Sequence, residues 1–320
     1  MRKLRSNILF ALILLSSSAS AKEIVVSFVG GNVSDSIQSV VTHNFNTFIS
    51  AISPYNNEPE LSSHFEKNTN NQNVSRFIQS ITIASVDIAS SYICHKTKDG
   101  YEIRDVIVNI LQRDSIYSER QLTVSFSSFG DISNISFSID KWLYNRVFLS
   151  STGLIAEDSI VKSDKEDKYS IVNFIEQYQT SFEIKDMAFI EALFSDDALI
   201  ITGASVKRHR SNDNNYQGIT SSMYKKYNKE TYLTSIRREM MSEEKSNLRI
   251  SDIEIEQHPL NKHVYGVTVV QKDKSGKYDD ERKLFLIIDA STENLIILKK
   301  MFLSKRESIG IRDFSIKQNN

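Results

Sequence analysis

The chain carries few side chains of the types and spacings that enzymes use. It has no G-x-S-x-G motif, no phosphate-binding glycine loop, no H-E-x-x-H and no paired C-x-x-C. Nucleophilic, nucleotide-dependent and zinc chemistry therefore lose their usual sequence support. The sequence predicts no catalytic residue, no metal and no cofactor.

The most visible acidic pair is Asp196 and Asp197. Two carboxylates that share a cavity can separate their pKa values and act as general acid and general base. The alternative is that both residues end a short helix and enter the next strand exposed to solvent. We favour the second interpretation.

Two other polar groups allow a functional and a structural interpretation. His258 and His263 flank a predicted turn and could meet across a hairpin as metal ligands, but no third ligand is evident. His258, which precedes Pro259, is more simply a turn residue. The basic cluster at residues 207–210 could dock an anionic partner, but a solvated loop is the favoured interpretation.

Cys94 is the only cysteine, so the chain has no intramolecular disulfide. The favoured interpretation is a small buried apolar side chain. A reactive thiol would need exposure and a cationic neighbour, and His95 and Lys96 are adjacent in sequence.

The elements that would position such groups are clearest in residues 169–203. Apolar residues at helical spacing predict one long amphipathic helix, with Ile171, Phe174, Ile175, Tyr178 and Phe182 on its buried face. Asp186 is expected to cap a short second helix. The apolar run at residues 198–202, closed by Gly203, predicts a strand that is covered on both faces.

The remaining second half predicts a third helix over residues 229–241 and four strands. The strands are expected at residues 248–257, 263–272, 279–289 and 294–303. Their connections are short, so consecutive strands should be antiparallel neighbours. Helical and strand patterns of this kind indicate an α+β fold.

This order of elements resembles the nuclear transport factor 2-like superfamily, over about residues 169–304. The resemblance rests mainly on the segment FIEQYQTSFEIKDMAFIEALFSDDALIITG. The superfamily also includes scytalone dehydratase, ketosteroid isomerase and the SnoaL-like cyclases. It implies a cystatin-like α+β cone, in which a curved antiparallel sheet wraps around the long helix.

A narrower resemblance involves the segments FSDDALIITG, IEIEQHPLNKHVYGVTVVQ and GYEIRDV. They look like parts of a family of exported proteins of Gram-negative anaerobes that has no assigned activity. The chain departs from that family's pattern near the end of its sheet, where it has Arg282-Lys283 and Lys299-Lys300-Met301-Phe302.

The cone that the resemblance implies would be the place for a ligand. The residues expected to line it are Phe174, Tyr178, Tyr232, Ile236, Tyr265 and Asp289. An isomerase or dehydratase would need a base and a proton donor facing each other there, with Asp289 or His258 as the base and a tyrosine opposite. No clear His-Asp couple of the dehydratase type can be placed, so we favour a binding function over an enzyme.

The first half, residues 22–150, predicts a smaller α+β domain with a β-hairpin that turns at Gly130-Asp131. A helix is expected from Val33 to Ile52, whereas residues 74–95 fit helix and strand equally. Residues 151–168 are expected to be a linker and residues 305–320 a tail. Two strand-turn-strand segments, one in each half, leave open that the first domain is a degenerate repeat of the second.

The N-terminus reads as an export signal. Arg2, Lys3 and Arg5 precede an apolar run and an A-x-A site that ends at Ala21, which is typical of a signal peptide over residues 1–21. The protein is therefore expected in the periplasm or outside the cell. Its formal net charge of −1 gives no reason to expect nucleic acid, and no later segment is long enough to span a membrane permanently.

The sequence thus predicts an exported, non-enzymatic binding or interaction protein. It would hold a partner protein or a small apolar ligand in the cone or on its sheet face, and it could form a homodimer through that face. The alternative is an enzyme of the cyclase, isomerase or dehydratase type.

Overall fold

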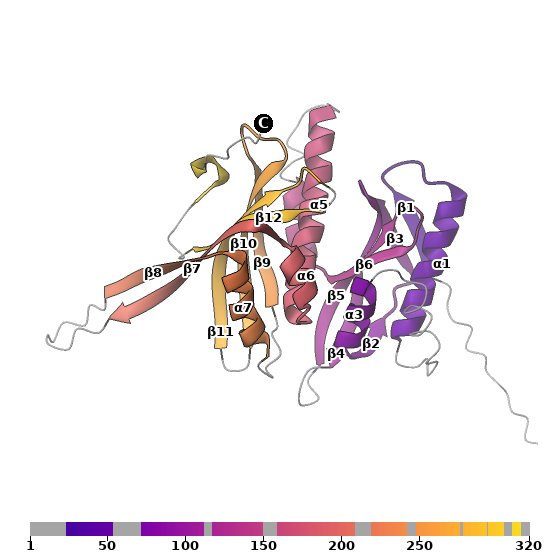
Figure 1. Ribbon diagram of the computed structural model, residues 1–320. Coiled ribbons are helices and arrows are strands. Elements are labelled where there is room, and N and C mark those ends of the chain that lie inside the picture. The colour runs from indigo at the N-terminus through magenta and orange to yellow at the C-terminus, as the bar shows by residue number, and fades with distance from the viewer. Residues whose placement is uncertain are drawn as a thin grey trace, which may run out of the picture.

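The computed structural model describes residues 24–53, 72–111, 117–149, 159–208, 219–241, 248–275, 278–292, 294–303 and 309–314. Two curved sheets lie on either side of one long helix, α5 (Figure 1). The chain is therefore α+β, as predicted. The predicted signal peptide, residues 1–21, lies outside the described residues.

The first half forms a six-stranded sheet with the order β1-β3-β4-β5-β6, and β2 also pairs with β4. Only β1 with β3 is parallel among these pairs; the other pairs are antiparallel. The elements are β1 (Val25–Val29), α1 (Asp35–Ile52), α3 (Gln72–Ser80), β2 (Ile83–Asp87), β3 (Ser91–Lys96), β4 (Gly100–Leu111), β5 (Tyr117–Ser127), β6 (Ile132–Phe137) and α4 (Lys141–Leu149).

The predictions for this half largely hold. The helix expected from Val33 to Ile52 and the hairpin that turns at Gly130-Asp131 are confirmed. The ambiguous residues 74–95 form a helix followed by two strands. The strand order of this sheet differs from that of the second sheet, in which the last strand is internal.

The second half forms a sheet with the order β8-β7-β12-β11-β10-β9. The four predicted strands are antiparallel neighbours, and β12 pairs in parallel with β7. The elements are α5 (Ser159–Glu183), α6 (Met187–Ala192), β7 (Phe194–Arg208), β8 (Ile219–Tyr227), α7 (Lys229–Met240), β9 (Leu248–Gln257), β10 (Val264–Ser275), β11 (Tyr278–Asp289), β12 (Ile296–Leu303) and a 3-10 turn, η2 (Ile311–Asp313).

The helix α5 starts earlier than the sequence pattern indicated. It begins at Ser159, so the expected linker over residues 151–168 is wrong for its second part. The charged run in these residues is compatible with a helix because Lys and Glu are good helix formers. Asp186 caps α6 as predicted, since its side chain accepts a hydrogen bond from the backbone N–H of Phe189.

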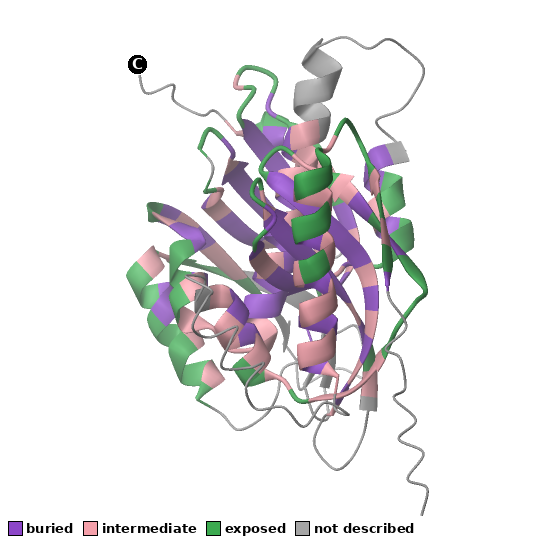
Figure 2. Ribbon diagram, turned by 90° about the vertical axis from the view of Figure 1, so that its right-hand side faces the viewer, coloured by how far each residue is buried: buried purple, intermediate pink, exposed green. Residues whose placement is uncertain are grey.

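Three buried clusters stabilise the fold. One fills the first half between α1, α3 and its sheet, and a second lies between α5 and the concave face of the second sheet. The third covers the convex face of that sheet, where Ile311 of η2 is completely buried and Phe314 stacks on Phe285. Figure 2 shows that the strands carry mainly buried and intermediate residues, whereas exposed residues gather on helices and loops.

Candidate functional site

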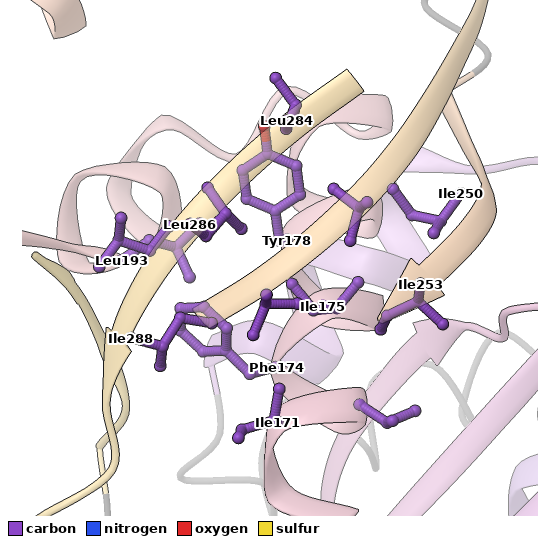
Figure 3. Close-up of a cluster of buried hydrophobic side chains, with 14 of the residues drawn as sticks. Ile171, Phe174, Ile175, Tyr178, Leu193, Ile250, Ile253, Leu284, Leu286 and Ile288 are labelled. Carbon is purple, nitrogen blue, oxygen red and sulfur yellow. The ribbon is translucent and has the colours of Figure 1, made fainter. Parts of the chain in front are cut away.

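The cone, meaning the space between α5 and the concave face of the second sheet, is filled by side chains. Ile171, Phe174, Ile175 and Tyr178 of α5 project toward the sheet (Figure 3). Several facing residues of the sheet are buried, among them Ile250, Ile253, Leu284, Leu286 and Ile288. Among the described residues, the interior is therefore a packed hydrophobic core.

Five of the six residues expected to line a ligand pocket belong to this core. Phe174, Tyr178, Tyr232 and Tyr265 are buried in it, and Ile236 packs against it. Their side chains fill the space that a ligand would need. The Tyr265 hydroxyl donates to Asp167 at 2.9 Å and receives a hydrogen bond from Gln257 at 3.0 Å.

The sixth residue, Asp289, does not line the cone, so the prediction that it is a pocket residue is wrong. It follows Phe285 and Ile287 on the opposite face of β11, because successive side chains of a strand alternate. Its carboxylate accepts a hydrogen bond from the backbone N–H of Ser291 at 2.8 Å. Asp289 thus stabilises a turn and does not face the cone.

His258 is a buried turn residue, as favoured from the sequence. Its Nδ1 accepts hydrogen bonds from the backbone N–H groups of Leu260 and Asn261, and its Nε2 lies 3.3 Å from the backbone oxygen of Phe314. The imidazole therefore links the turn after β9 to the C-terminal segment. It has no position from which to act as a base in the cone.

The other polar candidates also have structural surroundings. Asp196 and Asp197 are exposed, and Asp196 pairs with Lys229, whose hydrogen bond and charge lower the pKa of Asp196. Cys94 is completely buried, and burial raises the pKa of its thiol to about 12, with a further contribution from Glu102. This confirms the structural interpretation of Cys94. Residues 209–210 of the basic cluster lie outside the described residues.

A charged group not predicted from the sequence lies inside the cone. Lys300 of β12 is 1% exposed, and its Nζ donates to the hydroxyl oxygens of Tyr178 and Tyr232, both at 2.7 Å. Its ammonium position also lies 5.0–5.9 Å from five ring centroids, those of Tyr178, Phe182, Phe194, Tyr232 and Phe302. We call this arrangement the lysine cage.

The lysine cage favours a neutral amine. Burial, together with the charge of Arg282, lowers the pKa of Lys300 to about 7, although Glu239 opposes this shift. Burial likewise raises the pKa values of Tyr178 and Tyr232, so both hydroxyls keep their protons at neutral pH. The cage therefore joins a weakly basic amine to two neutral proton donors.

The opposite side of α5 meets the first half through buried ion pairs. Arg104 of β4 pairs with Glu176 of α5 and with Glu102, and Glu176 also accepts the backbone N–H of Ile139 at 2.8 Å. Burial would lower the pKa of Arg104, but the carboxylates of Glu176 and Glu102 outweigh it and keep the guanidinium charged. Completely buried Glu176 thus fixes α5 against the first sheet.

A second buried ion pair joins the C-terminal end of α5 to the first sheet. Arg120 of β5 makes two hydrogen bonds of 2.7 Å to the carboxylate of Glu183 and stacks on the ring of Phe137. Both side chains are less than one tenth exposed. The two halves are therefore joined by oriented, charge-assisted contacts rather than by apolar packing alone.

A cavity of about 450 Å³ opens beside Arg120, where the two halves meet. We call it the junction cavity. Its floor includes Gln179 of α5, whose amide accepts the backbone N–H of Ile250 at 2.8 Å. Its walls carry three cationic and two anionic side chains, namely Arg120, Arg249, Lys272, Glu119 and Asp140. This size suits a small ligand, and the lining suits a polar one.

The junction cavity could not be found from any sequence motif. Its walls come from β5, the segment after β6, α5, β9 and β10, which are far apart in the chain. Within the described residues, no group of His, Cys, Asp and Glu is arranged to hold a metal. Among the described helices, none is long and apolar enough to cross a membrane.

Comparison with known proteins found matches among solved structures alone. No family model matches the chain, and no curated protein matches its sequence, so the narrower resemblance to an exported family stays a prediction. Solved structures do match. One is a nuclear transport factor 2-like protein from Cytophaga hutchinsonii, which is 15% identical to this chain and has a TM-score of 0.30. The match covers 41% of this chain and 93% of the Cytophaga protein.

Two further structures show the range of proteins that match. A protein of unknown function with a cystatin-like fold, from Nostoc punctiforme, has 11% identity, covers 42% of this chain and 88% of its own, and has a TM-score of 0.30. A naphthalene 1,2-dioxygenase with indole in its active site has 8% identity, covers 41% of this chain and 74% of its own, and has a TM-score of 0.31.

Identities and scores this low carry no argument about function. The element order, the strand order and the core of the second half are those expected of the cone. The described residues between 169 and 303 therefore have the α+β cone that the resemblance to the nuclear transport factor 2-like superfamily implies.

Proposed function

We propose that this protein is an exported, non-enzymatic binding protein and that it holds a small polar ligand in the junction cavity. The observation that carries the proposal is the contrast between two spaces. The junction cavity is open and lined by charged side chains, whereas the cone is filled by the residues predicted to line it.

The same contrast changes the expected ligand. An apolar ligand in the cone would have to displace buried side chains such as Tyr178 and Leu286. A partner protein or second copy on the convex sheet face would meet Ile311 and Phe314, which already cover part of it. Partner binding and homodimer formation through that face therefore rank behind a polar ligand at the junction.

Export is the second part of the proposal and rests on the N-terminal sequence pattern. Fractionation of the source cell, combined with N-terminal sequencing, tests it. We expect the protein outside the cytoplasm with a first residue near Lys22. A cytoplasmic protein that retains residues 1–21 would overturn this part.

Native mass spectrometry of protein purified from the exporting cell tests the binding site. We expect a retained small molecule on the wild-type protein. In Ser251→Tyr, which places a ring in the cavity wall, at least 90% of the retained molecule should be lost because its space is filled. The matched variant Ser128→Tyr lies on an exposed turn and should retain it. Equal retention by both variants would contradict the proposed site.

The lysine cage supports a second candidate function. An amine with a pKa near 7 beside two tyrosine hydroxyls is a suitable base and donor pair for an isomerase or dehydratase. Trace labelling with acetic anhydride at pH 7 separates the candidates. A packed cone protects Lys300, so exposed Lys262 should be labelled at least 10-fold faster. Labelling of Lys300 ahead of Lys262 would favour the enzyme.

A further inference from the structure

The walls of the junction cavity carry charges of both signs. Arg249 of β9 and Lys272 of β10 supply cationic groups, and Glu119 of β5 and Asp140 supply carboxylates. Arg120 lies among them with its guanidinium already held by Glu183, and the Lys272 ammonium lies 3.6 Å from the Glu281 carboxylate. A ligand that matches this lining must offer both a negative and a positive group.

The cationic side of the cavity is held in place by the protein itself. The Arg249 guanidinium donates to the Ser118 hydroxyl at 3.2 Å and to the backbone oxygen of Glu119 at 3.4 Å. Partial burial and the nearby charge of Arg120 lower the pKa of Arg249. Two guanidinium groups so close together repel each other, and a bound carboxylate would relieve this repulsion.

The anionic side faces the same space. Asp140 lies at the start of α4, and Glu119 lies on β5 next to Arg120. The charges of both carboxylates act on Arg249, which places them within electrostatic reach of it. A purely anionic ligand would therefore meet repulsion from two carboxylates, whereas an ammonium group would be attracted.

We propose that the ligand is a small zwitterion, a free amino acid or short peptide, whose carboxylate binds Arg249 and Lys272 and whose ammonium group binds Glu119 and Asp140. This inference rests on the proposed binding function of the junction cavity. The absence of aromatic residues from the described lining agrees with a polar ligand rather than a stacked sugar or nucleobase. The volume of about 450 Å³ has room for a peptide of a few residues.

Titration calorimetry with three matched probes tests the proposal. The probes are L-alanyl-L-alanine, its N-acetyl derivative without the ammonium group, and its C-terminal amide without the carboxylate. The free dipeptide should bind, and each blocked form should bind about 10-fold or more weakly because it loses charge-assisted hydrogen bonds. Equal binding of all three, or preference for a blocked form, would overturn the inference.

Variants locate the two charged groups. Arg249→Gln should weaken the free dipeptide by about 10-fold or more, but should leave the amide, which lacks the carboxylate, nearly unchanged. Asp140→Asn should weaken the free dipeptide and leave the acetylated form unchanged. Arg238→Gln, an exposed change on α7, is the control and should affect neither. Arg249→Gln with unaltered dipeptide affinity would place the carboxylate elsewhere and overturn the inference.

The test separates this inference from the proposed function. If no dipeptide binds but the molecule retained by the wild-type protein is lost from Ser251→Tyr, the junction cavity binds another class and only the zwitterion is wrong. If no dipeptide binds and both serine variants retain the molecule equally, the proposed site and the inference both fail.

Discussion

Lys300→Met should remove a pH dependence from the stability of the protein. The pKa of Lys300 is lowered to about 7 in the folded chain, from 10.5 in an unfolded one. Between these values the unfolded chain binds one more proton, so the free energy of unfolding of the wild type rises with pH by up to about 1.4 kcal/mol per unit. Below pH 7 both states are protonated, and the cost of the buried ammonium is fully present.

The free energy of unfolding of the wild type should therefore rise by roughly 3 kcal/mol between pH 6.5 and pH 9.5 because of Lys300. The variant should lack this rise. Methionine is unbranched like lysine, although one atom shorter, and its thioether packs well against aromatic rings. Its loss of the hydrogen bonds to Tyr178 and Tyr232 costs about 1–3 kcal/mol at every pH, so the slope rather than the absolute value is diagnostic.

Urea unfolding across this pH range measures the effect. Lys299→Met is the matched control, because Lys299 is the preceding residue of β12 and lies over the ring of Phe314 outside the cone. The other charged or titratable groups that act on Lys300 are Arg282 and Glu239, which are both exposed, and the two tyrosines. A Lys300→Met slope equal to that of the wild type would show that the amine is not buried as described.

Glu176→Gln should be the most destabilising single change at the contact between the halves. It leaves the buried guanidinium of Arg104 without its main carboxylate and weakens the acceptor for the Ile139 N–H. Removing one partner of a buried ion pair costs about 3–5 kcal/mol, because the other charge remains in the interior.

Denaturant unfolding at pH 7 tests this expectation. Glu191→Gln is the control, since Glu191 pairs with Arg237 at the surface and both side chains are about half exposed. Its cost should stay below about 1 kcal/mol. A Glu176→Gln variant within 1 kcal/mol of the wild type would mean that the halves do not depend on this ion pair.

The architecture of the second half could be predicted from local patterns. The apolar face of α5 follows a helical spacing, and the short connections of the four last strands require antiparallel neighbours. Each of these signals is a local pattern in the sequence. They give the elements and the order of the meander, but they do not show what covers the opposite face of α5.

The opposite face of α5 carries no such local signal. Glu176 and Glu183 lie two turns apart on one face of α5, as polar residues of a solvated face do, yet they pair with Arg104 and Arg120 of the first half. Buried partners that lie 72 and 63 residues away leave no local pattern in the sequence. The linker prediction over residues 151–168 is wrong for its second part, because a charged run fits an exposed connection and a helix equally.

Lys300 could have been found from the sequence. Lys299 and Lys300 are adjacent in a predicted strand, and adjacent side chains of a strand point to opposite faces. Because one face of this strand must line the cone, one lysine had to be buried. The junction cavity offered no such signal, since its wall residues come together only after both halves have folded and docked.

A crystal structure of the protein purified from the exporting cell tests the central claim most directly. We expect a small zwitterion between Gln179, Arg249 and Lys272 in the junction cavity, with Tyr178, Tyr232 and Lys300 still filling the cone. A ligand bound within an opened cone, with Lys300 facing it and only solvent at the junction, would contradict the account.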